Sequence, residues 1–278
     1  MNTILPSRWS ERIHRLALGV EPVDAARGGR IGLPVQVAMD TWDGRDRRNP
    51  PGLPWEPADP RERIARTGSC RHRLLLRPGI ASPLDIRVLD AEKRYVPRRL
   101  SVELPDTLSP PESPPGSPPG RRLVGRVIRP ALFPGAAYPA PTGAVGCRGR
   151  VTRVDDTPVR WARVVAERTD GTVIGRAHGD ENGEFLLLLG SQTVVGAEMA
   201  LPLRATVTVF GPGVPPSPAP GDPADDPLWD LPLEAADDTG LGEAVLAGEE
   251  VPDGYVAGSV RTVEFGLDGL RSEEFDFS

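Results

Sequence analysis

Histidine, cysteine and carboxylate side chains are the groups of this chain that could do chemistry. The histidines and cysteines are few and widely separated: His14, His72, His178, Cys70 and Cys147. His178 and Glu181 have the His-x-x-Glu spacing of two zinc ligands, but no later histidine supplies the third ligand that such a site needs. We therefore interpret His178 as a turn residue beside Asp180 and expect no metal site.

Two further groups could be functional. The acidic run 180–184 has the composition of a calcium-binding loop, but it lacks the spacing and the flanking helices of one. We interpret it as a structural turn, with a weak surface calcium site as the alternative. Cys70 precedes the basic run 71–73, whose charges could lower the pKa of its thiol, yet nothing in the sequence orients His72. No nucleophile elbow, phosphate-binding loop or dinucleotide-binding glycine pattern occurs. We predict that the chain is not an enzyme and binds no cofactor.

The composition favours short strands and excludes long helices. Of the 278 residues, 33 are proline and 31 are glycine, while hydrophobic residues make up 38% and aromatic residues 5%. Proline and glycine interrupt nearly every window long enough for a helix, whereas strands joined by turns tolerate them. Residues 1–15 lack the apolar run of a signal peptide, and the longest strongly apolar stretch, 185–189, is too short to cross a bilayer. We expect a cytoplasmic protein with no membrane insertion and reduced thiols, with one Cys70–Cys147 bridge as the alternative.

Charge is unevenly distributed along the chain. Residues 211–278 carry 16 acidic and 2 basic side chains, a net charge of −14, whereas residues 1–210 carry +8. This asymmetry indicates self-association or docking onto a basic partner, with a solubilising tail as the alternative. The arginines are scattered and form no nucleic-acid motif, so we expect no nucleic-acid partner.

Two proline-rich stretches, 105–120 and 211 to about 232, divide the chain. The first has almost nothing apolar to bury and is predicted to be an extended spacer. The predicted fold is mainly β, with two tandem small antiparallel β-sandwich modules. The predicted parts are an N-terminal arm (1–11), a first β-sandwich module (12–105), a Pro-rich linker (106–120), a second β-sandwich module (121–210) and an acidic Pro-rich C-terminal arm (211–278).

Apolar and polar residues alternate with a period of two in several segments, which is typical of half-buried strands. In the first module these segments are LPVQVAMD, LDIRVLD and LSVELP. In the second they are LVGRVIRP, RGRVTRV, VRWARVVAER, GEFLLLLG and LRATVTVF. Both modules also contain a short Gly/Val strand followed by a Pro-Val strand. We therefore expect the modules to repeat one topology.

The second module resembles a carboxypeptidase-regulatory-like domain of the transthyretin-like sandwich class. The matching residues are Gly149-x-Val151, Pro158-Val159-x-x-Ala162-x-Val164 and Gly175-x-Ala177-x-x-Asp180-x-x-Gly183-x-Phe185. The resemblance implies a tight turn in which Gly183 takes a positive φ and Asp180 caps turn amides, before Phe185 enters the core. In that family this domain is non-catalytic, so the resemblance implies a fold and no activity.

A second resemblance is to accessory proteins of phage-tail-like contractile injection systems. It rests on the segments YVPRRLSVELP and PVRWARVVAE and on the proline-rich spacer between the modules. Such sandwich modules occur there beside, or fused to, tail-terminator (cap) proteins. The resemblance implies a non-enzymatic structural or assembly subunit, assembled in the cytoplasm into a particle that can be released. Its partners would be the tail terminator, sheath or tube proteins.

Aromatic side chains in polar segments are the candidate partner-binding residues. These are Trp9, Trp42, Trp55, Trp229, Phe265, Phe275 and Phe277. The end of the C-terminal arm alternates as a short strand, which could add to a sheet edge with its aromatic side chains in pockets. We expect that edge to belong to a neighbouring subunit, with its own module as the alternative. The competing function is binding of a sugar or a surface protein by the loop that carries Trp42 and Trp55.

Overall fold

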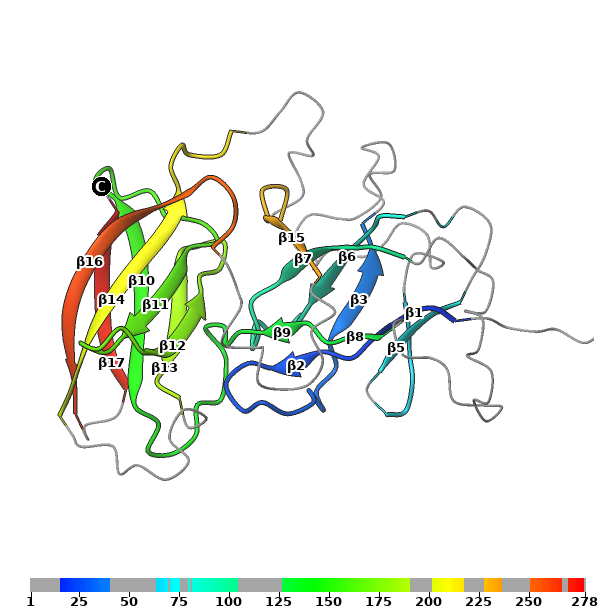
Figure 1. The fold of residues 1–278 in the computed structure, drawn as a ribbon, viewed down its shortest axis with the longest axis horizontal. Coiled ribbons are helices and arrows are strands. Elements are labelled where there is room, and N and C mark those ends of the chain that lie inside the picture. The colour runs from blue at the N-terminus through cyan, green and yellow to red at the C-terminus, as the bar shows by residue number, and fades with distance from the viewer. Residues whose placement is uncertain are drawn as a thin grey trace, which may run out of the picture.

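The computed structural model describes most of the segments predicted to be strands. The described residues are 16–40, 64–69, 71–75, 80, 82–104, 127–190, 202–217, 228–236, 251–266 and 270–277. Every regular element in these ranges is a strand (Figure 1), which confirms the predicted mainly-β fold. None of these ranges contains a helix able to span a membrane.

The first sandwich consists of two four-stranded sheets and a two-stranded one. One sheet has the order β4 (Ala65–Arg66), β5 (His72–Leu75), β1 (Leu16–Val20) and β8 (Val127–Ile128). The facing sheet has the order β15 (Leu233–Ala235), β7 (Arg98–Val102), β6 (Leu84–Leu89) and β3 (Gln36–Met39). The short pair is β2 (Val23–Asp24) and β9 (Ala131–Leu132).

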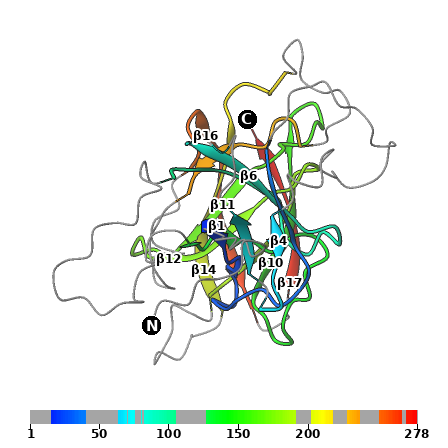
Figure 2. The ribbon, with the colours of Figure 1, turned by 90° about the vertical axis from the view of Figure 1, so that its right-hand side faces the viewer.

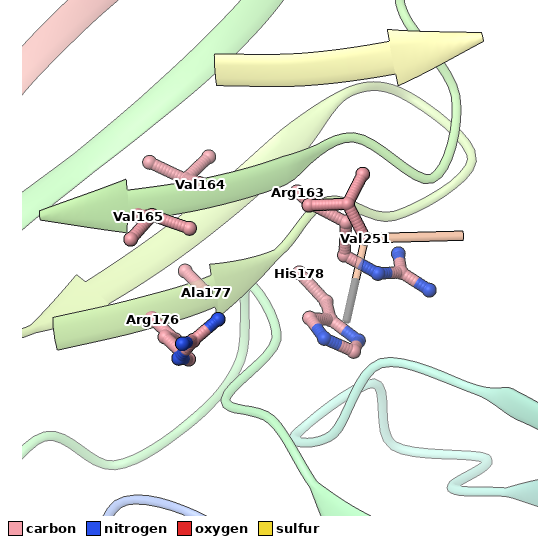
Figure 3. A pocket seen from close by; sticks show the side chains of 7 residues that line it. All are labelled: Arg163, Val164, Val165, Arg176, Ala177, His178 and Val251. Carbon is pink, nitrogen blue, oxygen red and sulfur yellow. The ribbon is translucent and has the colours of Figure 1, made fainter. Parts of the chain in front are cut away.

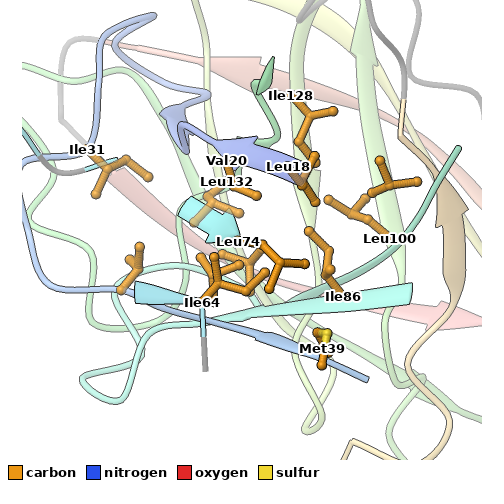
Figure 4. Packing of buried hydrophobic residues seen from close by; sticks show 14 of the residues in the cluster. Leu18, Val20, Ile31, Met39, Ile64, Leu74, Ile86, Leu100, Ile128 and Leu132 are labelled. Carbon is orange, nitrogen blue, oxygen red and sulfur yellow. The ribbon is translucent and has the colours of Figure 1, made fainter. Parts of the chain in front are cut away.

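Period-two alternation builds the core of the first sandwich. Ile86 of β6 and Leu100 of β7 point inward from one sheet and meet Leu18 and Val20 of β1 from the other (Figure 4). Ile86 and Val20 are completely buried. Polar residues between these positions, such as Asp85 and Arg99, lie on the opposite faces of their strands, so the alternation in the sequence predicts which face of each strand packs into this core.

The second sandwich consists of a three-stranded and a four-stranded sheet. The first has the order β13 (Glu184–Leu188), β10 (Gly146–Arg153) and β17 (Leu270–Phe277). The second has the order β12 (Val173–His178), β11 (Arg163–Glu167), β14 (Leu203–Pro212) and β16 (Tyr255–Phe265). The two sandwiches lie side by side along the longest axis in Figure 1 and overlap in Figure 2, which looks along that axis.

Both sandwiches contain the same six-strand plan. In the first, β1 pairs antiparallel with β5 and parallel with β8, while β3, β6 and β7 form an antiparallel series. In the second, β10 pairs in the same way with β13 and β17, and β11, β14 and β16 form the equivalent series. The expected repeat of one topology is therefore present, but each copy contains a parallel pair where the sequence predicts antiparallel sheets only.

The boundary between the modules differs from the predicted one. The sequence pattern assigns LVGRVIRP to the second module and predicts that this module begins at residue 121. The structure instead places β8 beside β1, with Val20 opposite Ile128, and β9 beside β2. Ile128 and Leu132 are buried in the core of the first sandwich. Because β8 completes that sheet, the chain must cross the proline-rich stretch before the first sandwich can close.

The acidic C-terminal segment is not a free arm. β16 pairs with β14 along its length, and β17 runs parallel to β10 from Gly146 to Arg153. Both strands therefore belong to the second sandwich, and the expected docking onto a neighbouring subunit is wrong for these residues. The physical reason is burial: Phe265, Phe275 and Phe277 fill the core of their own sandwich, which lacks that apolar volume without them.

Candidate interaction site between the two sandwiches

One short part of the acidic segment contacts both sandwiches. Residues 228–236, called the clasp below, approach the first sandwich through β15, which pairs in parallel with β7. The register places Glu234 opposite Leu100, and the Ala236 amide donates to the Ser101 carbonyl at 2.9 Å. The clasp therefore extends a sheet of the first sandwich although β14 and β16, the strands before and after it in the chain, belong to the second.

Glu234 bridges the two sandwiches. Its carboxylate accepts hydrogen bonds from Arg98 of β7 and from Arg163 of β11. All three side chains are at most 15% exposed. Arg98 also donates to the Ala131 carbonyl at 2.8 Å, and Arg163 to the Trp161 carbonyl at 2.7 Å. Removing one member of such a buried ion pair would leave an uncompensated charge, so loss of Glu234 would be costly at this junction.

Asp230 makes the second ionic contact of the clasp. Both of its oxygens accept from Arg160, at 2.6 and 2.7 Å, and one also accepts from the Trp161 indole at 2.8 Å. The Asp230 side chain is 1% exposed. A bidentate arginine–carboxylate pair is both stronger and more directional than a single contact, so Asp230 fixes the position of the clasp on the second sandwich.

An apolar cluster lies beside these ion pairs. It joins Leu89 and Val96 of the first sandwich, Trp161 of the second, and Leu228 and Leu231 of the clasp. Apolar surface from three separate parts of the chain is thereby removed from water. The junction is a small core of its own, not a hinge filled with solvent.

Trp161 takes an unusual backbone conformation at the centre of the junction. Its φ is +58°, in the left-handed region that bulky residues seldom adopt. The conformation persists because its surroundings hold it: the indole donates to Asp230, and the carbonyl accepts from Arg163 and from the Tyr255 hydroxyl, the latter at 3.1 Å. Burial raises the pKa of Tyr255 to about 12, so this hydroxyl stays protonated and donates.

His178 is buried at the same junction. Its ring stacks on Phe133 of the first sandwich, with the ring centroids 3.8 Å apart. Burial lowers its pKa well below 6.5, and the charge of Arg163 adds to this effect. His178 and Arg163 line a hollow of about 10 Å³ together with Val251 (Figure 3). That volume suits about one water molecule, so it is not a small-molecule site.

The chemical candidates from the sequence have structural roles. The Asp180 carboxylate accepts the amides of Asn182 at 2.8 Å and Glu184 at 3.0 Å, which is the predicted turn. Gly183 has a φ of +73° there. Among the described residues, no cluster could hold a metal ion. Cys147 is a buried free thiol whose pKa is raised to about 12 by burial, and Cys70 lies outside the described residues.

The aromatic residues predicted to bind a partner lie in different parts of the structure. Trp9, Trp42 and Trp55 lie outside the described residues. Trp229 is half-buried within the clasp. The three phenylalanines of the C-terminal segment are at most 4% exposed in their own sandwich, which removes them as partner-binding residues: Phe265, Phe275 and Phe277.

Sequence reasoning missed the ionic residues of the junction. One signal was present at Arg98, which shares the inward parity of Leu100 and Val102 in β7 and so places a charge where the alternation expects an apolar side chain. Its carboxylate partner, Glu234, lies 136 residues away. No local pattern identifies such a partner, because the pairing depends on how the clasp crosses between the sandwiches.

Comparisons with known proteins identify no family. No family model matches the chain, and no curated protein matches it. A 9R-lipoxygenase from Cyanothece PCC8801 is 15% identical with a TM-score of 0.24, over 51% of this chain and 17% of that one. The Bacillus anthracis TIE protein is 10% identical with a TM-score of 0.25, over 95% of this chain and 34% of that one. The shaft pilin spaA from Lactobacillus rhamnosus GG is 8% identical with a TM-score of 0.23, over 96% and 99%.

The chain thus spans about a sixth and a third of the first two of these proteins. At TM-scores this low, the matches assign neither a fold family nor an activity.

Proposed function

We propose that this chain is a non-enzymatic structural or assembly subunit whose two sandwiches act as one block. The observation that carries the proposal is the buried bridge from Arg98 through Glu234 to Arg163. A subunit that transmits or resists force needs its parts held in fixed orientation, and a buried, hydrogen-bonded ion pair supplies orientation as well as free energy.

The residues that could have supported catalysis favour the same proposal. Asp180 is used to close a turn, and Cys147 is buried with its pKa raised, which disfavours the reactive thiolate. His178 is stacked on Phe133 inside the junction. Each of these side chains therefore has a packing or hydrogen-bonding role that accounts for its position.

We further propose that the assembly is a phage-tail-like contractile injection particle, with a place at its cap end. This step rests on the sequence resemblance of segments 95–105 and 158–167 to proteins that accompany such particles. The proposed partners are the tail terminator, the sheath and the tube, and assembly would take place in the cytoplasm.

Co-expression tests this function. The chain is produced together with the tail-terminator, sheath and tube proteins of a contractile injection particle, and complexes are isolated through an affinity tag on the chain. We expect at least one of these proteins to co-purify in a fixed ratio. Elution of the chain alone from every mixture, or sugar binding without any particle protein, would contradict the proposal.

A further inference from the structure

The clasp lies within a loop that the second sandwich does not need. β14 and β16 are antiparallel neighbours, and Pro212 at the end of one is the register partner of Tyr255 at the start of the other. A turn of about two to five residues would join such strands. This chain uses the 42 residues 213–254 instead. Because the two ends of the loop are already paired with each other, the clasp can leave its site without opening that strand pair.

β15 is also outside the plan that the two sandwiches share. The six common strands are complete in the first sandwich without it, and its position is an addition to the edge of β7. In the second sandwich the strand equivalent to β7 is β16, and among the described residues no further strand is added to its edge. β15 is therefore an edge addition of the kind by which one protein segment binds the sheet of another.

The clasp and its site are complementary in charge. Both carboxylates that the clasp brings, Asp230 and Glu234, contact arginines of the sandwiches. The clasp comes from the part of the chain with a net charge of −14, whereas residues 1–210 carry +8. The same opposition of charge exists between two copies of the chain, and it would steer a clasp toward the site of another copy.

The chain on either side of the clasp is long enough to reach a second copy. Fifteen residues separate Pro212 from Leu228, and eighteen separate Ala236 from Tyr255. When extended, fifteen residues span up to roughly 50 Å, which exceeds the diameter of a small domain.

We propose that the clasp is exchanged between copies: the segment 228–236 of one chain adds to β7 of a second chain and places its carboxylates on that chain's arginines. The occupant is a second copy because the clasp is the segment whose fit to this site the structure displays. Every hydrogen bond and ion pair that the clasp gives up within its own chain is replaced by an identical one between chains. The ratio of exchanged to unexchanged clasps therefore depends on the protein concentration and on the effective concentration of the tethered clasp. The inference deepens the proposed assembly function and rests on it.

Binding of a peptide with the clasp sequence tests directly whether the site accepts a clasp from another molecule. The probe is a fluorescent peptide with the sequence of residues 228–236, LWDLPLEAA. The receptor is the full chain carrying Asp230→Asn and Glu234→Gln, which keep the shape of the clasp and remove its charge. We expect the peptide to bind this variant at least about tenfold more tightly than the natural chain, whose own clasp competes. A control peptide with the same two substitutions should bind at least about tenfold more weakly. Equal binding of both peptides, or no binding, would overturn the proposal.

Mixing two variants tests exchange between copies. The first variant is the clasp-defective chain above, and the second carries Arg163→Gln, which weakens the site and leaves the clasp intact. Light scattering should show a 1:1 complex in the mixture that neither variant forms alone. Circular dichroism checks that each variant is folded. If one variant is unfolded, the peptide titration described above still tests whether the clasp sequence binds the site. A mixture that stays monomeric while the peptide binds would refute the second copy as occupant.

This experiment uses the purified chain alone. Its failure would therefore leave association with tail proteins intact, and failure of the co-expression test would leave clasp exchange intact.

Discussion

Several arginines in this protein pair with carboxylates that are buried or half-buried, and one of them, Arg98, stands where the alternation of β7 expects an apolar side chain. Arg98 and Arg163 at the junction share Glu234, and Arg87 and Arg99 in the first sandwich share Asp40. Burying these ions costs several kcal/mol each unless partners compensate. The arrangement favours one alignment of strands, because a shift in register would separate every pair.

His178 should make stability depend on pH. The folded protein keeps this ring neutral, since burial holds its pKa well below 6.5, whereas the unfolded chain takes up a proton near pH 6.5. The free energy of unfolding should therefore fall as the pH drops below about 6.5, by up to about 1.4 kcal/mol per pH unit. Urea unfolding at several pH values measures this slope, and His178→Gln should reduce it.

His72 is a second buried histidine that should contribute to the pH dependence of the free energy of unfolding. Burial lowers its pKa too, so His72→Gln should remove a separate part of the slope. If the slope is the same in His178→Gln and in the natural chain, the ring is not held neutral in the fold.

Asp24 holds two tyrosines, and removing either hydroxyl should destabilise the first sandwich. One carboxylate oxygen accepts from Tyr95 at 2.9 Å and from Tyr138 at 2.8 Å. Because hydrogen bonds to a charged acceptor are strong, Tyr138→Phe should cost about 1.5–3 kcal/mol in thermal or urea unfolding. Tyr255→Phe is the matched control. The Tyr255 hydroxyl donates to the neutral Trp161 carbonyl, so its removal should cost only about 0.5–1.5 kcal/mol. Equal losses would contradict the role of the Asp24 charge.

Among the elements, β17 decides whether the second sandwich exists. It provides the parallel neighbour of β10 over eight register pairs. It also passes close to β16, where a Cβ added at Gly258 would lie 2.2 Å from the Phe277 ring. Glycine is needed there because two strands of opposite sheets approach each other at the edge of the sandwich.

Ending the chain at residue 269 should therefore unfold the second sandwich. The truncation removes Phe275 and Phe277, and deleting each buried ring costs about 3–5 kcal/mol, so the sum approaches the whole stability of a typical domain. Proton NMR and circular dichroism should report lost structure. Val260→Ala, at a position 61% exposed on β16, should change stability by less than about 0.5 kcal/mol. A truncated chain with an intact second sandwich would mean that β17 is an appendage.

For the whole molecule, the clasp determines how the sandwiches are held. Glu234→Gln removes the charge shared by Arg98 and Arg163, and we expect a loss of about 3–5 kcal/mol from the unfolding free energy. Small-angle X-ray scattering should show a larger radius of gyration while each sandwich keeps its strands. The control is Glu181→Gln, which breaks the exposed pair with Lys93 at 2.6 Å and should cost less than about 1 kcal/mol. Equal effects would show that the clasp adds nothing to the junction.

The local elements of this protein follow from its amino-acid sequence alone. Alternation in the segments around Ile86 and Leu100 predicts strands and their buried faces, because a side-chain period of two depends only on neighbouring residues. The turn at Asp180 and Gly183 is predictable for the same reason, since its hydrogen bonds and positive φ lie within a few residues. The similarity of the two modules also follows from local pattern.

Which strands complete which sandwich depends instead on the tertiary fold. β8 follows the proline-rich stretch yet closes the first sheet, and β17 inserts beside β10 although more than a hundred residues separate them. The sequence records that such strands have an apolar face but not which edge receives it. The same holds for Glu234, whose two arginines lie 136 and 71 residues away. Partner choice is decided by competition among all edges and charges in the folded chain, and no local pattern carries that information.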